Sequence, residues 1–221
     1  MSFLLRVVLP DRPGSLGAVA TALGNAGADI LGLDVVERHH GLAVDDLAVE
    51  LPSGRPPDVL ITAAESVPGV EVESVRPHSG RLDTHRELEL VEEITGEPGR
   101  GLELLAEGVP RIFRAGWAIV VFREGGRSYR VAQSAAAPET VAGDLPWLPL
   151  ERAVVIDPAV HWVPGPWSDL DTELAAAPLG PEPQALVVGR PGGPAFRPSE
   201  LARLTHLAGI VRTVLIGAEV G

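Results

Sequence analysis

The sequence predicts an α+β protein made of two domains. Its first 75 or so residues alternate strand-like and helix-like patterns, a short Pro- and Gly-containing segment follows, and the remainder combines helices with a β-hairpin. A chain of 221 residues with 45% hydrophobic content can form two small cores. We therefore expect one domain at 1–77, a linker at 78–82 and a second domain at 83–221.

The first domain is predicted from a buried strand at 3–9 and a helix that begins near Gly14. The apolar residues of this helix recur at helical spacing, and Gly24 and Gly27 close it. The later elements are strands at 29–37, 42–51 and 70–75 and, between the last two, a helix opened by Pro56-Pro57-Asp58. The resulting order, β-α-β-β-α-β, is the split-βαβ or ferredoxin-like arrangement.

The second and third strands each gather apolar residues on one face. These residues are Leu31, Leu33 and Val35 in the second strand and Leu47, Val49 and Leu51 in the third. Side chains alternate between the two faces of a sheet, so Gly32 and Asp34 lie on the opposite face of the second strand.

The second domain is predicted to begin with a helix at 82–95, in which Leu88, Val91 and Ile94 are helically spaced, and a helix at 102–113. "AGWAIVVFREGGRSYRVAQS" predicts a hairpin that turns at Gly125-Gly126. The proline-rich stretch at 135–183 shows a single strand signal, at 153–156. A strand and a long helix close the domain; the helix has an apolar stripe of Leu201, Leu204, Leu207, Ala208, Val211 and Leu215.

Composition limits the possible functions. The net charge is −12 and all 18 basic residues are arginine, so neither domain offers the basic surface that nucleic-acid binding needs. Cysteine is absent, which excludes disulfides, thiol nucleophiles and thiolate metal sites. The first apolar run is too short for a secretory signal, and we count no stretch of the ~20 apolar residues that span a membrane. We expect a soluble, cytoplasmic protein that binds neither a membrane nor a nucleic acid.

The stretch "LPDRPGSLGAVATAL", residues 9–23, is the strongest candidate for a binding site. It joins the first strand to the first helix, where free backbone N–H groups and the helix dipole favour a carboxylate. Gly14 lets a ligand approach the backbone because it has no Cβ. Asp11 can hold the loop by accepting N–H bonds, or it can meet an ammonium group. One loop can therefore bind both ends of an amino-acid zwitterion.

Asp11-Arg12-Pro13-Gly14 with Leu16, in a chain of this strand order, resembles the ACT domain, a regulatory module that senses amino acids in metabolic enzymes. The resemblance covers residues 3 to about 76. ACT domains commonly pair side by side, with the ligand between this loop and the start of the neighbour's second strand. The resemblance thus implies a homodimer and an amino acid or similar small carboxylate as ligand. The implied ligand-binding residues are Asp11, Arg12, Pro13, Gly14, Ser15 and Leu16 of one chain and Asp29, Ile30 and Leu31 of the other.

Asp29 departs from the family pattern, which often has asparagine before the apolar run of the second strand. An aspartate there repels the carboxylate of a ligand but attracts its amino group, and both outcomes stay open. A further alternative is that the D-x-P-G element only shapes the turn and that the domain only dimerises.

Residues from about 82 to 217 resemble a GAF domain, an α/β/α sandwich with an antiparallel sheet. The resemblance depends on the apolar strand at 117–122, the hairpin and the closing "ALVVGRPGGPAFRPSELARLTHLA". Pro198 starts the last helix and Glu200 favours its first turn, while Arg197 stands where a capping Ser or Thr is commoner. GAF domains bind small molecules or pair through their first and last helices, so we expect a second ligand or partner here.

Other candidate sites are weaker. Asp157 and His161 are four residues apart, but flanking prolines place them in a loop, and His39-His40 fits an exposed turn, so we expect no metal. Asp169 and Asp171, after Ser168, look like a helix start.

Three tryptophans, Trp147, Trp162 and Trp167, either line the mouth of a pocket or fill the core beneath a long loop. The chain has no dinucleotide fingerprint, no lysine for a phosphate-binding loop and no G-x-S-x-G, so we expect no cofactor and no catalytic residue.

These patterns together predict a non-catalytic regulatory protein. Its first domain would bind an amino acid and form a dimer, and its second domain would bind a second ligand or a partner. Two alternatives remain: an enzyme with an active site in residues 135–183 that the first domain controls allosterically, and a pure dimerisation adaptor.

Overall fold

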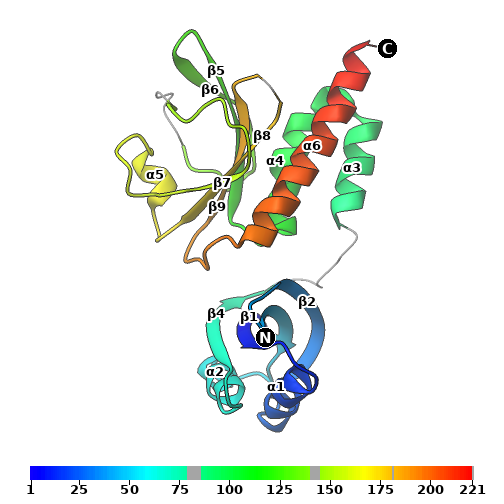
Figure 1. Cartoon of the computed structure of the whole chain (residues 1–221), viewed down its shortest axis with the longest axis vertical. Coiled ribbons are helices and arrows are strands. Elements are labelled where there is room, and N and C mark those ends of the chain that lie inside the picture. Colours follow the sequence, from blue (N-terminus) through cyan, green and yellow to red (C-terminus); the bar gives the residue numbers. More distant parts are fainter. Residues whose placement is uncertain (79–85, 140–144, 181, 221) are drawn as a thin grey trace. The chain divides into compact units, whose positions relative to one another are not determined.

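The computed structural model describes residues 1–78, 86–139, 145–180 and 182–220. The chain divides into two compact units, Met1–Asp83 and Thr84–Gly221. Each unit has its own antiparallel sheet and its own hydrophobic core (Figure 1). The expected linker at 78–82 falls, apart from His78, outside the described residues. The predicted α+β class is confirmed.

The first unit has the predicted βαββαβ order. Its elements are β1 (Ser2–Pro10), α1 (Ser15–Asn25), β2 (Asp29–His39), β3 (Leu42–Glu50), α2 (Asp58–Glu65) and β4 (Glu71–Pro77). The strands pair antiparallel in the order β2-β3-β1-β4, so β2 and β4 are the edges of this sheet. The ferredoxin-like arrangement is therefore confirmed.

Helices α1 and α2 cover one face of this sheet. Alternate residues of β1 and β3, such as Leu5, Val7 and Leu47, form the core with Val19 and Leu23 of α1 and with Leu60 of α2. Gly14 precedes α1 with a φ of 92° and Gly27 follows it with a φ of 81°, left-handed conformations that glycine adopts without strain. The sequence thus sets both ends of the first helix.

The apolar side chains of edge strand β2 are only half covered. Leu31, Leu33 and Val35 are 43%, 40% and 41% exposed. Leu33 lies opposite Leu47 on β3, which places it on the helix-covered face, and register shifts flank this stretch of β2. An apolar edge strand of this kind is suited to pairing with another strand.

The second unit places a five-stranded sheet among three long helices and a layer of loops. Its elements are α3 (Arg86–Gly96), the 3₁₀ turn η1 (Pro98–Arg100), α4 (Gly101–Ile112), β5 (Trp117–Glu124), β6 (Arg127–Gln133), β7 (Val154–Ile156), α5 (Gly165–Ser168), β8 (Glu173–Pro178), β9 (Gln184–Arg190) and α6 (Pro198–Val220). The strand order is β6-β5-β9-β8-β7, with every neighbouring pair antiparallel. The predicted hairpin is β5–β6, and Gly125 and Gly126 at its turn have φ values of 58° and 77°.

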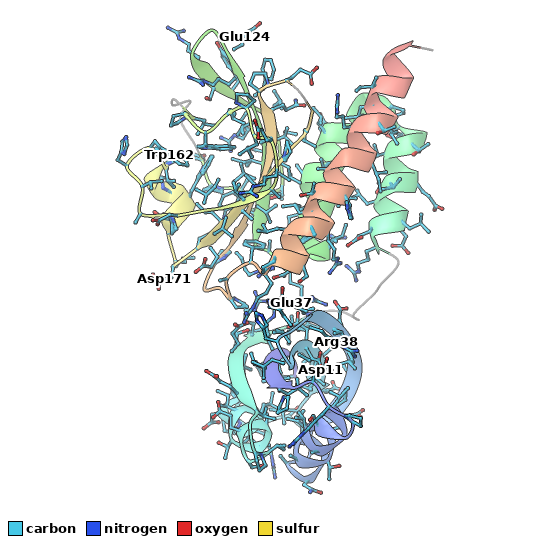
Figure 2. All side chains as sticks on the ribbon, viewed as in Figure 1. Asp11, Glu37, Arg38, Glu124, Trp162 and Asp171 are labelled. Carbon is cyan, nitrogen blue, oxygen red and sulfur yellow. The ribbon has the colours of Figure 1, made fainter. Side chains whose placement is uncertain are left out.

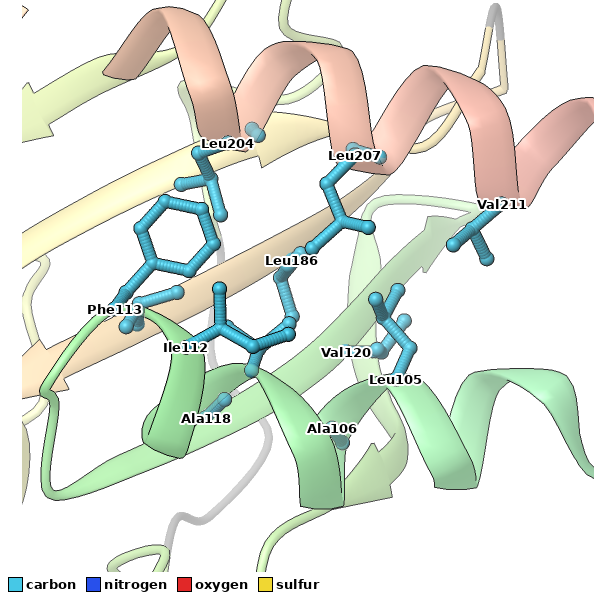
Figure 3. Packing of buried hydrophobic residues seen from close by; sticks show 14 of the residues in the cluster. Leu105, Ala106, Ile112, Phe113, Ala118, Val120, Leu186, Leu204, Leu207 and Val211 are labelled. Atoms are coloured by element: carbon cyan, nitrogen blue, oxygen red, sulfur yellow. The ribbon is translucent and has the colours of Figure 1, made fainter. Parts of the chain in front are cut away.

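Helices α3, α4 and α6 lie on one side of this sheet, and the loop that contains α5 lies on the other (Figure 1). Figure 3 shows how Leu204, Leu207 and Val211 of α6 face Leu105 of α4 and Leu186 of β9. The two layers enclose the sheet as in the predicted sandwich, although the second layer is mostly irregular among the described residues.

Two details of the predicted helices are wrong. On α3 the buried residues are Leu90 and Ile94, whereas Leu88 is 59% exposed, because the face that packs on the core is rotated from the predicted stripe. Asp169 and Asp171 do not begin a helix: α5 ends at Ser168, and Leu170 and Asp171 have positive φ values before β8 begins.

Helix α6 is long and apolar enough to span a membrane. Its residues Pro198–Ala218 reach a mean hydropathy of 1.3, contrary to the expectation that the chain has no such stretch. Leu204, Leu207, Ala208 and Val211 are nevertheless buried in the core of the second unit. This stripe is that of a helix that packs against a sheet.

One arginine holds the Gly- and Pro-rich segment before α6 in place through hydrogen bonds. Arg190 at the end of β9 donates to the main-chain oxygens of Phe113 and Pro194 at 2.7 and 2.9 Å, and its guanidinium lies 4.0 Å from the centre of the Phe196 ring. Glu200 accepts from Arg190 and also from the main-chain N–H of Arg197 at 2.9 Å, the second half of a capping box. This bond compensates for the absence of a Ser or Thr cap at Arg197.

Candidate functional site

The loop between β1 and α1 is held by its own backbone. The N–H of Asp11 donates to the carbonyl of Gly41 at 2.8 Å, and the N–H of Ser15 donates to that of Arg12 at 3.2 Å. Gly14 occupies the N-cap position, and no side chain caps α1. The next N–H groups of the helix, at Leu16 and Gly17, have no acceptor within the helix, so the helix start can donate to an anion.

A groove of about 450 Å³ opens beside this helix start. One wall is the loop and first turn of α1, and the other is the segment between α2 and β4. The lining residues are Pro10, Arg12, Pro13, Gly14, Ser15, Ala18, Val67, Pro68 and Val70. Four of the predicted site residues therefore share one groove, while Leu16 packs against the core beneath them.

Asp11 lies outside the groove lining and faces a cation instead. Its Oδ1 is 3.8 Å from Nε of Arg38 on β2, and both side chains are partly exposed to solvent (Figure 2). The loop is held by the main-chain N–H of Asp11 rather than by bonds to its carboxylate. The carboxylate is therefore positioned by Arg38, at the end of the edge strand.

The predicted residues on β2 lie at the opposite end of the sheet from this loop. Asp29 pairs with Glu50, which pairs with Ser2 at the start of β1, whereas Asp11 follows the end of β1, where Pro10 pairs with Leu42. At ~3.3 Å per residue, the length of β1 separates the two groups by roughly 25 Å. A single chain does not bring Asp29, Ile30 and Leu31 to residues 11–16, as expected if the two groups serve different chains of a pair.

A buried carboxylate on β3 was not predicted from the sequence. Asp45 on β3 alternates with Ala43 and Leu47, so its side chain is on the helix-covered face. It is 3% exposed, and within the described part of the chain its Oδ1 has no hydrogen-bond partner. Burial raises its pKa above the ordinary value of 3.8, Arg38 lowers it, and Asp46, Asp11 and Asp34 raise it further. An acid in phase with Leu47 and Val49 was the signal that could have revealed it.

The remaining candidates are structural. Oδ1 of Asp157 accepts the N–H of Ala159 at 2.8 Å, which shapes a loop. His39 and His40 lie in the turn between β2 and β3, where their ring centres are 3.7 Å apart. No cluster of three or more potential metal ligands occurs among the described residues.

The tryptophans of the second unit pack in the core under the loop. Trp167 is 1% exposed, and its ring centre is 6.1 Å from that of Trp117. Trp147 and Trp162 are 6.0 Å apart and pack against the same cluster. Of the two interpretations offered by the sequence, the structure supports core filling.

Comparison with known families bears on the first unit. Residues 3–69 match the model of the ACT domain. This segment is an ACT domain. The matched residues include the D-x-P-G loop, Val67 and Pro68 of the groove wall and the strands β1, β2 and β3.

Known structures resemble the second unit. A free methionine-R-sulfoxide reductase from Neisseria meningitidis, in complex with its substrate, has a TM-score of 0.50 and 14% identity, and the match covers 64% of this chain and 96% of that one. GAF domains of phosphoenolpyruvate-protein phosphotransferases from Acinetobacter and from Coxiella burnetii each have a TM-score of 0.47 over 62% of this chain. They are 15% and 14% identical to it, and the matches cover 97% and 96% of their lengths. No curated protein matches the chain.

These matches give the chain an ACT domain followed by a unit with GAF-like structural neighbours. ACT and GAF domains are typically regulatory modules that sense ligands, although some of the similar structures come from enzymes.

Proposed function

We propose that this protein is a non-catalytic cytoplasmic regulator whose ACT domain binds an amino acid or a similar small carboxylate. The observation that carries the proposal is the uncapped start of α1, which opens beside a groove at Gly14. Two features favour a carboxylate there: N–H groups without an intrahelical acceptor, and the positive charge of Arg12, one of the residues that line the groove. Gly14 leaves the backbone open, since a Cβ built on it has no atom within 4 Å.

We propose that the complete site needs a second copy of the chain. Edge strand β2 has half-exposed Leu31, Leu33 and Val35, which a neighbouring strand would cover. If two β2 strands pair antiparallel about a two-fold axis, the Asp29 end of one lies beside the His39 end of the other. His39 pairs with Leu42, which pairs with Pro10 beside Asp11, so Asp29, Ile30 and Leu31 of the second copy would adjoin residues 11–16.

The GAF-like unit is proposed to bind a second ligand or a partner that reads the signal. Its likeness to a reductase is one of fold alone, at 14% identity. The described part of 135–183 uses Trp167 as core and the Asp157 carboxylate as a loop support. These roles support a regulatory function over an active site in that segment.

Isothermal titration of the full chain with each of the twenty amino acids tests this proposal. We expect saturable binding of one or a few of them to the wild-type protein, and none to Gly14→Val. Gly24→Ala is the matched control, because Gly24 lies near the other end of α1, has no positive φ and has open space around it, so binding is retained. Binding that survives Gly14→Val would move the site elsewhere, and an absence of binding together with a dimeric mass would favour the pure adaptor.

A further inference from the structure

Asp45 is a buried acid on β3, and among the described residues no donor reaches its Oδ1. It sits in the middle of the sheet, opposite Val7 of β1 on one side and Val35 of β2 on the other. Its neighbour Asp46 points to the opposite face and is held there by Arg6, with Nε–Oδ1 and Nη2–Oδ2 distances of 2.7 and 2.8 Å. Asp45 has no such cation in contact and leaves Oδ1 without a donor among the described residues.

The charges around Asp45 are mostly negative. Arg38 is the cation among the groups that act on it, and Arg38 also lies 3.8 Å from Asp11. The other charged groups that act on it are Asp11, Asp34 and Asp46, and α1, whose sequence is SLGAVATALGN, adds no charged side chain. A buried carboxylate in such surroundings is costly unless a positive group compensates it.

Asp45 lies on the strand next to edge strand β2, where the proposed ligand site forms. Only β2 separates β3 from the open edge, and Val35, the β2 residue opposite Asp45, is 41% exposed. Arg38 and Asp11 mark the same end of that edge.

Building on the proposed function, we propose that Asp45 accepts the ammonium group of the bound ligand and so selects compounds that carry a positively charged amino group. The α1 start and Arg12 then take the carboxylate, and Asp45 supplies the buried acceptor for the other end of the zwitterion. The same carboxylate discriminates against the 2-hydroxy acid of equal shape, which has no positive charge to offset the burial of Asp45.

The test compares two ligands and three proteins in the full chain. The ligands are the amino acid that binds best to the wild type and the 2-hydroxy acid that carries a hydroxyl in place of its amino group. The proteins are the wild type, Asp45→Asn and the control Glu71→Gln, which changes an exposed acid on β4 that lies outside the charged groups acting on Asp45. We expect Asp45→Asn to weaken amino-acid binding by roughly 10- to 100-fold, with the hydroxy acid unaffected and the control near wild type.

A second measurement on the wild type alone does not depend on a variant that folds. Because burial raises the pKa of Asp45, ammonium binding should release a proton in any buffer in which the ligand-free protein keeps this carboxyl protonated. Titrations in two buffers of different ionisation enthalpy measure this release, and the hydroxy acid should give none. Suppose that the wild type binds the amino acid, but that Asp45→Asn changes neither its preference for the amino acid over the hydroxy acid nor the proton release. This inference is then overturned, while the proposed function stands. If no amino acid binds the wild type, both are overturned.

Discussion

Arg190 and Glu200 form a buried ion pair that joins the last strand of the second unit to the start of its last helix. The Nη2–Oε1 distance is 2.6 Å, and the two side chains are 0% and 3% exposed. The same arginine holds the carbonyl of Phe113 at the end of α4, so one guanidinium links a strand and two helices. A pair this deeply buried is costly to break, because removal of one charge leaves the other without compensation.

We expect Arg190→Met to lower the free energy of unfolding by about 3–5 kcal/mol. Denaturant unfolding followed by tryptophan fluorescence measures this, since Trp117 and Trp167 lie in the core of the same unit. The control is Arg100→Met, which removes an exposed ion pair with Glu97 (Nη1–Oε2 distance 3.0 Å) and should have no measurable effect. Equal stability of the two variants would show that the buried pair contributes nothing.

The Gly14 prediction separates backbone strain from steric contact. Gly14 has a φ of 92° but open space around it, so Gly14→Ala is strained by its backbone conformation alone and should cost about 1–2 kcal/mol of stability. Gly17→Ala, three residues on in the helix, should instead stabilise the protein by up to about 1 kcal/mol. Thermal unfolding checks this: the change in stability should be negative for Gly14→Ala and positive for Gly17→Ala. Changes of the same sign would contradict a left-handed conformation at Gly14.

Asp45→Asn should change the pH dependence of stability. The folded-state pKa of Asp45 lies above 3.8, so the folded protein holds this proton more tightly than the unfolded chain does. Protonated Asp45 therefore contributes stability to the folded wild type that is fully present below pH 3.8. This contribution is lost as pH rises through the folded-state pKa. We expect Asp45→Asn to gain stability relative to the wild type as pH rises above 3.8. Parallel denaturant curves from pH 4 to 8 check this, and a constant difference would contradict it.

The proposed pairing through β2 predicts the behaviour of Leu33→Lys. In light scattering at micromolar concentration, the wild type should have twice the 23.2 kDa mass of a single chain. A lysine at Leu33 places a charge in the covered apolar face of the pair, so the variant should become monomeric and lose amino-acid binding. Val131→Lys, on edge strand β6 of the other sheet and 45% exposed in the wild type, is the matched control and should stay dimeric. A monomeric wild type would contradict the composite site.

Local patterns were enough to predict most elements, and they failed where pairing decides the structure. Strand β8 was missed because its sequence, ELAAAP, is rich in alanine, which has low strand propensity. It is a strand because it pairs with β7 on one side and β9 on the other, and a local propensity pattern does not show such pairing. Leu88 was assigned to the wrong face because helical spacing alone does not fix which side of α3 meets the core.

The loop of the candidate site was predictable from local sequence, but the buried acid Asp45 was not. The D-x-P-G loop is recognisable in the sequence from its prolines and glycine. The structure places Arg12, Pro13, Gly14 and Ser15 along one groove. Asp45 is different, because its isolation depends on which side chains lie near it in space. Alternation with Leu47 places it on the buried face, but only the folded sheet shows that no donor reaches Oδ1 among the described residues.

The most direct test is a crystal structure of the full chain grown with the amino acid that binds it best. The account predicts two chains paired through β2, with density for the ligand between residues 11–16 of one copy and residues 29–31 of the other. The ligand's carboxylate should lie at the start of α1, and its amino group should lie toward Asp45. Ligand density in the GAF-like unit alone, or an ACT domain whose β2 edges do not meet, would contradict it.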